Sequence, residues 1–194
     1  SSTLPQGWEI NRPTYTAGNG TQVAGGIRSY GNNGQVDRAL GSLTNNGQAP
    51  LIFGASFIND TGGTITTFDI QYTGEQWRRG ANNSVDTLRF EYSLNASSII
   101  DATASWVSVN ALDFASPNVG NTAAALNGNL LANRAALGAT ITGLNITNGG
   151  DFYIRYIDSD ITGGNDHGLA VDNFQITPDG VAPPQVPAPA SLLL

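Results

Sequence analysis

The sequence predicts an all-β fold: an antiparallel two-sheet β-sandwich, jelly-roll-like, followed by an extended Pro-rich C-terminal tail. Three observations predict it. Short runs such as Phe68–Tyr72 and Leu88–Leu94 alternate apolar and polar residues, which is the period of half-buried strands. Clusters of Gly, Asn and Thr, such as Asn45–Gly47, separate these runs at short intervals and favour tight turns. The length of 194 residues suits one sandwich domain.

The strands are expected wherever an alternating or β-branched run lies between two turn clusters. These runs lie at residues 6–10, 21–29, 35–41, 50–59, 64–73, 86–95, 105–110, 137–144, 151–158 and 169–177. The clearest alternations predict the following core-facing side chains: Phe68, Ile70, Tyr72, Leu88, Phe90, Tyr92, Leu94, Phe152, Ile154 and Tyr156.

The segment from Thr122 to Leu137 is the only candidate for a helix, because it is rich in Ala and Leu. Gly128 and several Asn residues weaken that prediction. An ordered loop with a single helical turn is the alternative.

The composition changes after Thr177, so the sandwich is assigned to residues 1–177 and the tail to residues 178–194. The tail is Pro-rich up to Pro189 and should adopt extended polyproline-like conformations. It ends in three leucines, far fewer than the roughly 20 apolar residues that span a bilayer. No membrane span is predicted.

Charge and composition exclude several classes of protein. The formal net charge is −7, and all eight cations are Arg, with no Lys and no Cys. A nucleic-acid or anionic-membrane partner is therefore not expected, because both require clustered cations. Disulfides and thiol chemistry are impossible without Cys. The opening Ser1–Pro5 is typical of a mature terminus left after removal of a signal peptide, so we expect an extracellular protein.

The end of the chain resembles a known sorting signal. The run Val-Pro-Ala-Pro-Ala-Ser-Leu-Leu-Leu at 186–194 is similar to the opening of the PEP-CTERM signal of exported bacterial proteins, with Ala188 where Glu is usual. The run Tyr-Thr-Gly-Glu-Gln-Trp-Arg at 72–78 is similar to a segment of an uncharacterised exported domain that often precedes such signals. The resemblance implies a bacterial cell-surface location and a β-sandwich. It brings no enzymatic activity with it.

An acid-rich stretch before the last strand is a candidate metal site. Calcium takes six to eight oxygen ligands from carboxylates, amides and carbonyls. A structural calcium would be held by Asp158, Asp160, Asn165, Asp166 and Asp172. The alternative is that these acids are turn residues whose side chains accept backbone hydrogen bonds.

A polar–aromatic cluster is a candidate ligand site. Trp77 could support a sugar ring, with Glu75 and Arg78 hydrogen-bonding its hydroxyls. The alternative is an ion pair beside a core tryptophan. Glu75 and Glu91 could form a glycosidase acid pair, but Glu91 is expected to point outward from a regular strand. His167 is the only histidine, and with no Cys and no nucleophile-elbow motif the chain is predicted not to be an enzyme.

Two functions follow from these observations. The first is a structural protein of the cell surface or biofilm matrix that assembles with copies of itself into filaments. In this hypothesis the tail adds a strand to the sheet edge of a neighbour, through Pro187, Pro189, Leu192, Leu193 and Leu194. The alternative is a carbohydrate-binding module of the extracellular matrix, with a polysaccharide as its partner.

Overall fold

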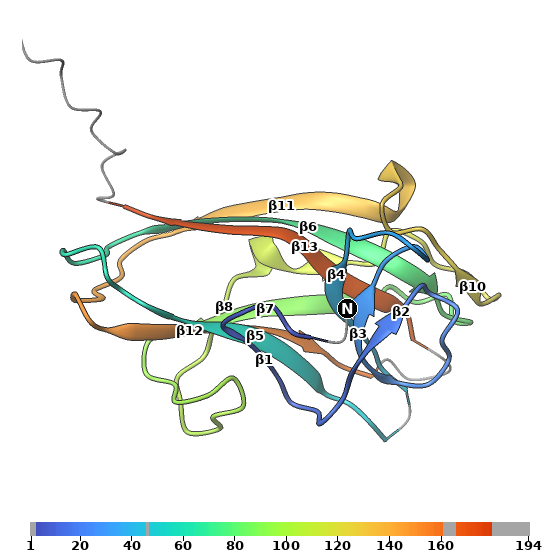
Figure 1. Ribbon diagram of the computed structural model, residues 1–194, viewed down its shortest axis with the longest axis horizontal. Helices are drawn as coiled ribbons and strands as arrows, with labels where there is room; N and C mark the ends of the chain where they lie inside the picture. Colours follow the sequence, from blue (N-terminus) through green and yellow to red (C-terminus); the bar gives the residue numbers. More distant parts are fainter. Residues whose placement is uncertain (1–2, 46, 161–165, 180–194) are drawn as a thin grey trace, which may run out of the picture.

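Two facing β-sheets make up the molecule (Figure 1). The computed structural model describes residues 3–45, 47–160 and 166–179. Apart from two short 3₁₀ helices, η1 (Asn110–Leu112) and η2 (Leu131–Asn133), all the regular elements in this part of the chain are strands. The predicted antiparallel two-sheet sandwich is confirmed.

The first sheet is antiparallel throughout. Its strand order is β1 (Trp8–Ile10), β5 (Leu51–Ile58), β12 (Asp151–Asp158), β7 (Thr87–Ser93) and β8 (Val107–Ser108), and β9 (Phe114–Ala115) also pairs with β7.

The second sheet forms the upper layer in Figure 1. Its strand order is β10 (Ala124–Ala125), β6 (Phe68–Arg79), β13 (Gly168–Pro178), β4 (Ala39–Leu43), β3 (Gly26–Tyr30) and β2 (Tyr15–Gly18), and β11 (Arg134–Ile141) also pairs with β6. The pair β2–β3 is parallel and the other pairs are antiparallel.

Aromatic rings from both sheets fill the core. Tyr156 is fully buried, and its ring centroid lies 5.3 Å from those of Phe53, Tyr72 and Phe90. These spacings are in the favourable range for tilted and edge-on ring pairs. The alternation read from the sequence therefore produced the core directly, because every second residue of β6, β7 and β12 points between the sheets.

The predicted core list is wrong at one position. Leu94 is 42% exposed, because β7 ends at Ser93 and the chain turns away before the alternation reaches it. Tyr92 is only half-buried, although it packs against the core. The other eight predicted side chains are buried.

The candidate helix over 122–137 is not formed. This segment contains β10, the one-turn helix η2 and the first residues of β11, which is closer to the alternative of a loop with a single helical turn. Pairing of β11 with eight residues of β6 outweighs the helix propensity of its Ala and Leu residues. The strand β2 was not predicted, and the run 105–110 contains only the two-residue strand β8.

The sandwich extends slightly beyond its predicted end. β13 continues to Pro178, and the Asp179 carboxylate accepts backbone hydrogen bonds from Thr66 at 2.8 Å and Thr67 at 2.9 Å. In the described ranges, no helix is long and apolar enough to cross a membrane.

Candidate functional site

An open groove combines aromatic and polar side chains at one side of the sandwich. Its volume is about 210 Å³, and its lining comes from the N-terminal segment, β1, β4 with the residue before it, and β13. The described residues that line it are Pro5, Trp8, Arg38, Leu40, Val171, Asp172, Asn173 and Phe174. We call it the Trp8 groove.

The core fixes the aromatic wall of the Trp8 groove. The Trp8 ring is half-buried and stacks near Tyr156 at a centroid distance of 6.4 Å. It also meets the edge of Phe174 at 5.6 Å and 88°. One part of the indole is thus held by the core while another part faces the groove.

A β-bulge positions the polar side of the Trp8 groove. The register of β13 against β6 shifts between Asp172 and Gln175, and Asn173 has a positive φ of 51°. A positive φ is uncommon for a residue other than Gly, and bulges frequently re-aim side chains near functional sites. The Asn173 backbone N–H donates to Asp172 Oδ1 at 2.8 Å. The bulge therefore places a carboxylate and an exposed amide side by side at the groove.

Arg38 and Asp172 are the charged groups of the Trp8 groove. Arg38 Nε donates to Ser29 Oγ at 3.1 Å, which fixes the guanidinium. Burial raises the pKa of Asp172, against the hydrogen bond from Asn173. The groove thus presents donors and acceptors around an aromatic surface, a combination suited to a neutral ligand with many hydroxyls.

Only Asp172 of the groove lining was among the predicted site residues, and it was assigned to calcium. The sequence pattern gives little indication of the other lining residues, because Trp8, Arg38 and Asn173 lie far apart in the sequence. The two neighbouring polar residues Asp172 and Asn173 interrupt the alternation of β13, and that interruption could have indicated the bulge.

The predicted sugar platform at Glu75, Trp77 and Arg78 is buried. Their exposures are 1%, 1% and 5%. The Trp77 ring stacks on Tyr30 at 6.0 Å, and a Cβ on Gly128 would lie 2.4 Å from Trp77 Nε1. The segment around Gly128 therefore covers Trp77, and no surface platform is formed there.

The alternative of an ion pair beside Trp77 is not formed among the described residues either. Trp77 Nε1 donates to Glu75 Oε2 at 2.8 Å, and Arg78 donates to the Gly20 carbonyl at 3.2 Å. Burial raises the pKa of the Glu75 carboxyl to about 7, although the Trp77 hydrogen bond lowers it. Glu75 is thus a buried acid that is costly to ionise.

Replacing Glu75 with glutamine should flatten the dependence of stability on pH. A carboxyl whose pKa is raised on folding, here from 4.5 to about 7, contributes stability that is present below pH 4.5 and lost as the pH rises through 7. We expect wild type to lose about 2 kcal/mol more stability than E75Q between pH 5 and pH 8. Urea unfolding at both pH values measures this difference.

The exposed Asp69 provides the control for this experiment. D69N should lose as much free energy of unfolding as wild type does between pH 5 and pH 8. If E75Q loses as much stability as wild type between pH 5 and pH 8, Glu75 is not the group that causes the pH dependence.

The predicted calcium ligands separate into two places. Asp158 and Asp166 are both fully buried and share the Thr44 hydroxyl. Asp172 lies at the Trp8 groove instead. Asn165 lies outside the described residues, and Asp160 follows Asp158 with a partly exposed side chain.

A residue that the sequence did not suggest joins the buried acids. Asp86 is 1% exposed. Burial is the largest cause that raises its pKa to about 7, and the Asp166 carboxylate is the second. Burial and Asp86 raise the pKa of Asp158 well above its ordinary range. As they stand, no three His, Cys, Asp or Glu side chains of the described chain form a group that could hold a metal ion.

His167 has a structural environment. It is fully buried; Gly80 N–H donates to its Nδ1 at 2.8 Å, so Nε2 carries the proton and donates to the Ser84 carbonyl at 3.0 Å. Burial lowers its pKa. The imidazole therefore fastens the 80–84 loop, and its ring nitrogens are both engaged.

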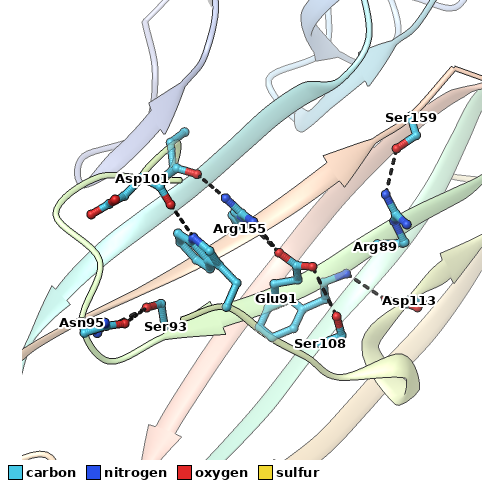
Figure 2. Close-up of polar contacts among 12 residues, drawn as sticks. Arg89, Glu91, Ser93, Asn95, Asp101, Ser108, Asp113, Arg155 and Ser159 are labelled. Atoms are coloured by element: carbon cyan, nitrogen blue, oxygen red, sulfur yellow. Dashed lines mark hydrogen bonds and ion pairs between the residues drawn. The ribbon is translucent and has the colours of Figure 1, made fainter. Parts of the chain in front are cut away.

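Glu91 and Glu75 do not form a carboxylate pair, because they lie on β7 and β6 in different sheets. Glu91 pairs with Arg155 at 2.7 Å, and Arg155 also donates to the Ile99 carbonyl at 3.1 Å. Figure 2 shows Arg155 between Glu91 and the loop that contains Asp101. The Arg155 guanidinium lies 3.7 Å from the Trp106 ring centroid. This cluster anchors the 94–106 loop on the first sheet.

The proposed assembly residues Pro187, Pro189, Leu192, Leu193 and Leu194 lie outside the described residues. Assembly through the tail therefore stays a prediction.

Comparison with known proteins gives similarity in fold. No protein-family model matches the chain, and no curated protein matches its sequence. Similar solved structures include the CBM22-1 xylan-binding domain of Paenibacillus barcinonensis Xyn10C, with 14% identity, a TM-score of 0.43, and 89% of this chain and 86% of that chain covered. The K3 adhesin domain of Lys-gingipain from Porphyromonas gingivalis has 13% identity and a TM-score of 0.45, with coverage of 89% and 93%.

A third similar structure is TmCBM61 in complex with β-1,4-galactotriose. It has 11% identity and a TM-score of 0.42, and the match covers 90% of both chains. At such identities the similarity concerns the sandwich fold and assigns no function.

Proposed function

We propose that this protein is a non-catalytic module that binds a polysaccharide outside the cell, with the Trp8 groove as its binding site. The observation that supports this proposal is the groove itself: a half-buried Trp8 ring beside the Asp172 carboxylate, the exposed Asn173 amide and the Arg38 guanidinium.

The chemistry of a sugar fits these groups. A pyranose has apolar C–H faces and a rim of hydroxyls. The flat indole of Trp8 offers area for the apolar face. The carboxylate of Asp172 accepts hydrogen bonds, Arg38 donates them, and the Asn173 amide can do both. A groove open to solvent can also accept a chain that continues on both sides.

The proposal is for binding without catalysis. Most glycoside hydrolases place two carboxyl groups across the scissile bond, about 5–9.5 Å apart. Among the described residues that line the Trp8 groove, Asp172 is the only acid. A second carboxyl group for acid–base chemistry is therefore not supplied by this lining.

The binding test uses the full chain and a panel of soluble xylan, β-1,4-galactan and hydroxyethyl cellulose. We expect at least one of them to bind in isothermal titration calorimetry. W8A should weaken the affinity about 10- to 100-fold, the range for losing a central aromatic contact. Since Trp8 also packs on the core, N173G provides a second variant: it removes the amide and accommodates the positive φ, so it should weaken binding without lowering stability.

Trp106 is the matched control, because it is a half-buried tryptophan anchored on the first sheet away from this lining. W106A should bind as wild type does. If no polysaccharide binds, or if W106A loses binding while W8A and N173G keep it, the proposed site is wrong.

The extracellular location of this activity is part of the proposal. The Lys-free acidic composition and the PEP-CTERM-like end support it. The filament hypothesis has no support from the described residues and stays a prediction.

A further inference from the structure

The antiparallel pairing brings four oxygen-bearing side chains to one end of the sandwich. In the first sheet, Asp158 at the end of β12 is paired with Leu88, two residues after Asp86. In the second sheet, the Leu43–Gly168 pair brings Thr44, at the end of β4, close to Asp166, just before β13. The ends of both sheets therefore contribute to one cluster.

Direct contacts connect this cluster across the two sheets. Thr44 Oγ1 lies 3.4 Å from Asp158 Oδ1 and also hydrogen-bonds to Asp166 Oδ2. Asp86 and Asp166 lie near enough to Asp158 to repel its carboxylate. The three acids are 0–1% exposed, so this repulsion is poorly screened by water.

Two carboxylate oxygens of the cluster, Asp86 Oδ2 and Asp158 Oδ2, are buried atoms with no hydrogen bond of normal geometry to the described residues. A buried carboxylate oxygen without a partner is costly. The ion pair between Arg155 and Glu91 lies elsewhere, and no Arg or His of the described chain forms one with Asp86 or Asp158. All three acids can therefore be ionised together only if a cation balances their charge.

We propose that this end of the sandwich binds a calcium ion through the carboxylates of Asp86, Asp158 and Asp166 and the Thr44 hydroxyl. An oxygen-only ligand set selects a hard cation. Calcium accepts irregular arrangements of six to eight oxygens, whereas magnesium requires a near-ideal octahedron. Ion binding would draw the carboxylates inward to ligand distance. The ion would then link the two sheets.

The test compares calcium-dependent stability in wild type and in matched variants. After removal of metal with EDTA, calcium at a hundredfold excess over its Kd should raise the wild-type melting temperature by about 5–10 °C. D158N should show no calcium-dependent rise. In EDTA the melting temperature of D158N should equal or exceed that of wild type, because one buried carboxylate has been removed. D69N, which changes an exposed acid on the second sheet, should keep the full rise.

Terbium luminescence excited through tyrosine gives an independent measure of binding, since Tyr30 lies close enough to Asp158 for its pKa to be affected. If D158N does not fold, D86N replaces it in both measurements. The proposal is overturned if calcium leaves the wild-type melting temperature unchanged and terbium does not bind at millimolar concentration. It is equally overturned if the folded D158N or D86N variant keeps the full calcium response.

Discussion

Replacing Phe90 with alanine should lower the free energy of unfolding by about 3–5 kcal/mol. Phe90 is fully buried at the centre of β7, and its ring lies 5.3 Å from Tyr156. The truncation removes transfer free energy and leaves a cavity between two sheets that cannot collapse around it. Urea unfolding monitored by circular dichroism measures the loss.

Leu94 is the matched control, because it follows β7 and is 42% exposed. L94A should change stability by no more than about 0.5 kcal/mol. A loss as large as that of F90A would mean that the alternation continues past Ser93 and that Leu94 is a core residue after all.

Replacing Trp77 with alanine is expected to have an effect of similar size, about 3–5 kcal/mol. The loss has two parts: the cavity beneath the segment around Gly128, and the missing indole N–H that donates to Glu75 at 2.8 Å. An acceptor left unpaired in a buried site adds its own desolvation cost. Thermal or urea unfolding of W77A gives the value.

W77F helps to separate the two parts, because it fills most of the cavity with a six-membered ring but removes the pyrrole ring that carries the N–H donor. It should recover more than half of the loss. A W77A variant as stable as wild type but unable to bind polysaccharide would instead restore Trp77 as the sugar platform and contradict its burial.

The sequence determined the fold class and most of the core. Alternation in β6, β7 and β12 was sufficient, because a period of two assigns each side chain to one face before any partner strand is known. The run Asp151–Asp158 was predicted at its observed bounds for this reason. The alternation failed at Leu94, where the strand ends, and in β11, where pairing with β6 outweighs the local preference of Ala and Leu.

The candidate sites depended on tertiary structure. The sequence left open whether Glu75, Trp77 and Arg78 form a sugar platform or lie beside a core tryptophan, and the structure buries them because this part of β6 is covered on both faces. The sequence grouped Asp158 with Asp172, which the structure places apart, and it gave no reason to include Asp86, about 70 residues away in the chain. Pairing of β12 with β7 brings Asp86 near Asp158, and packing of the first sheet on the second brings Trp8 to the groove that Asp172 lines. Neither kind of long-range contact is encoded in the local pattern of a strand. Local periodicity thus determined which residues are inside, whereas long-range strand register decided which polar groups meet.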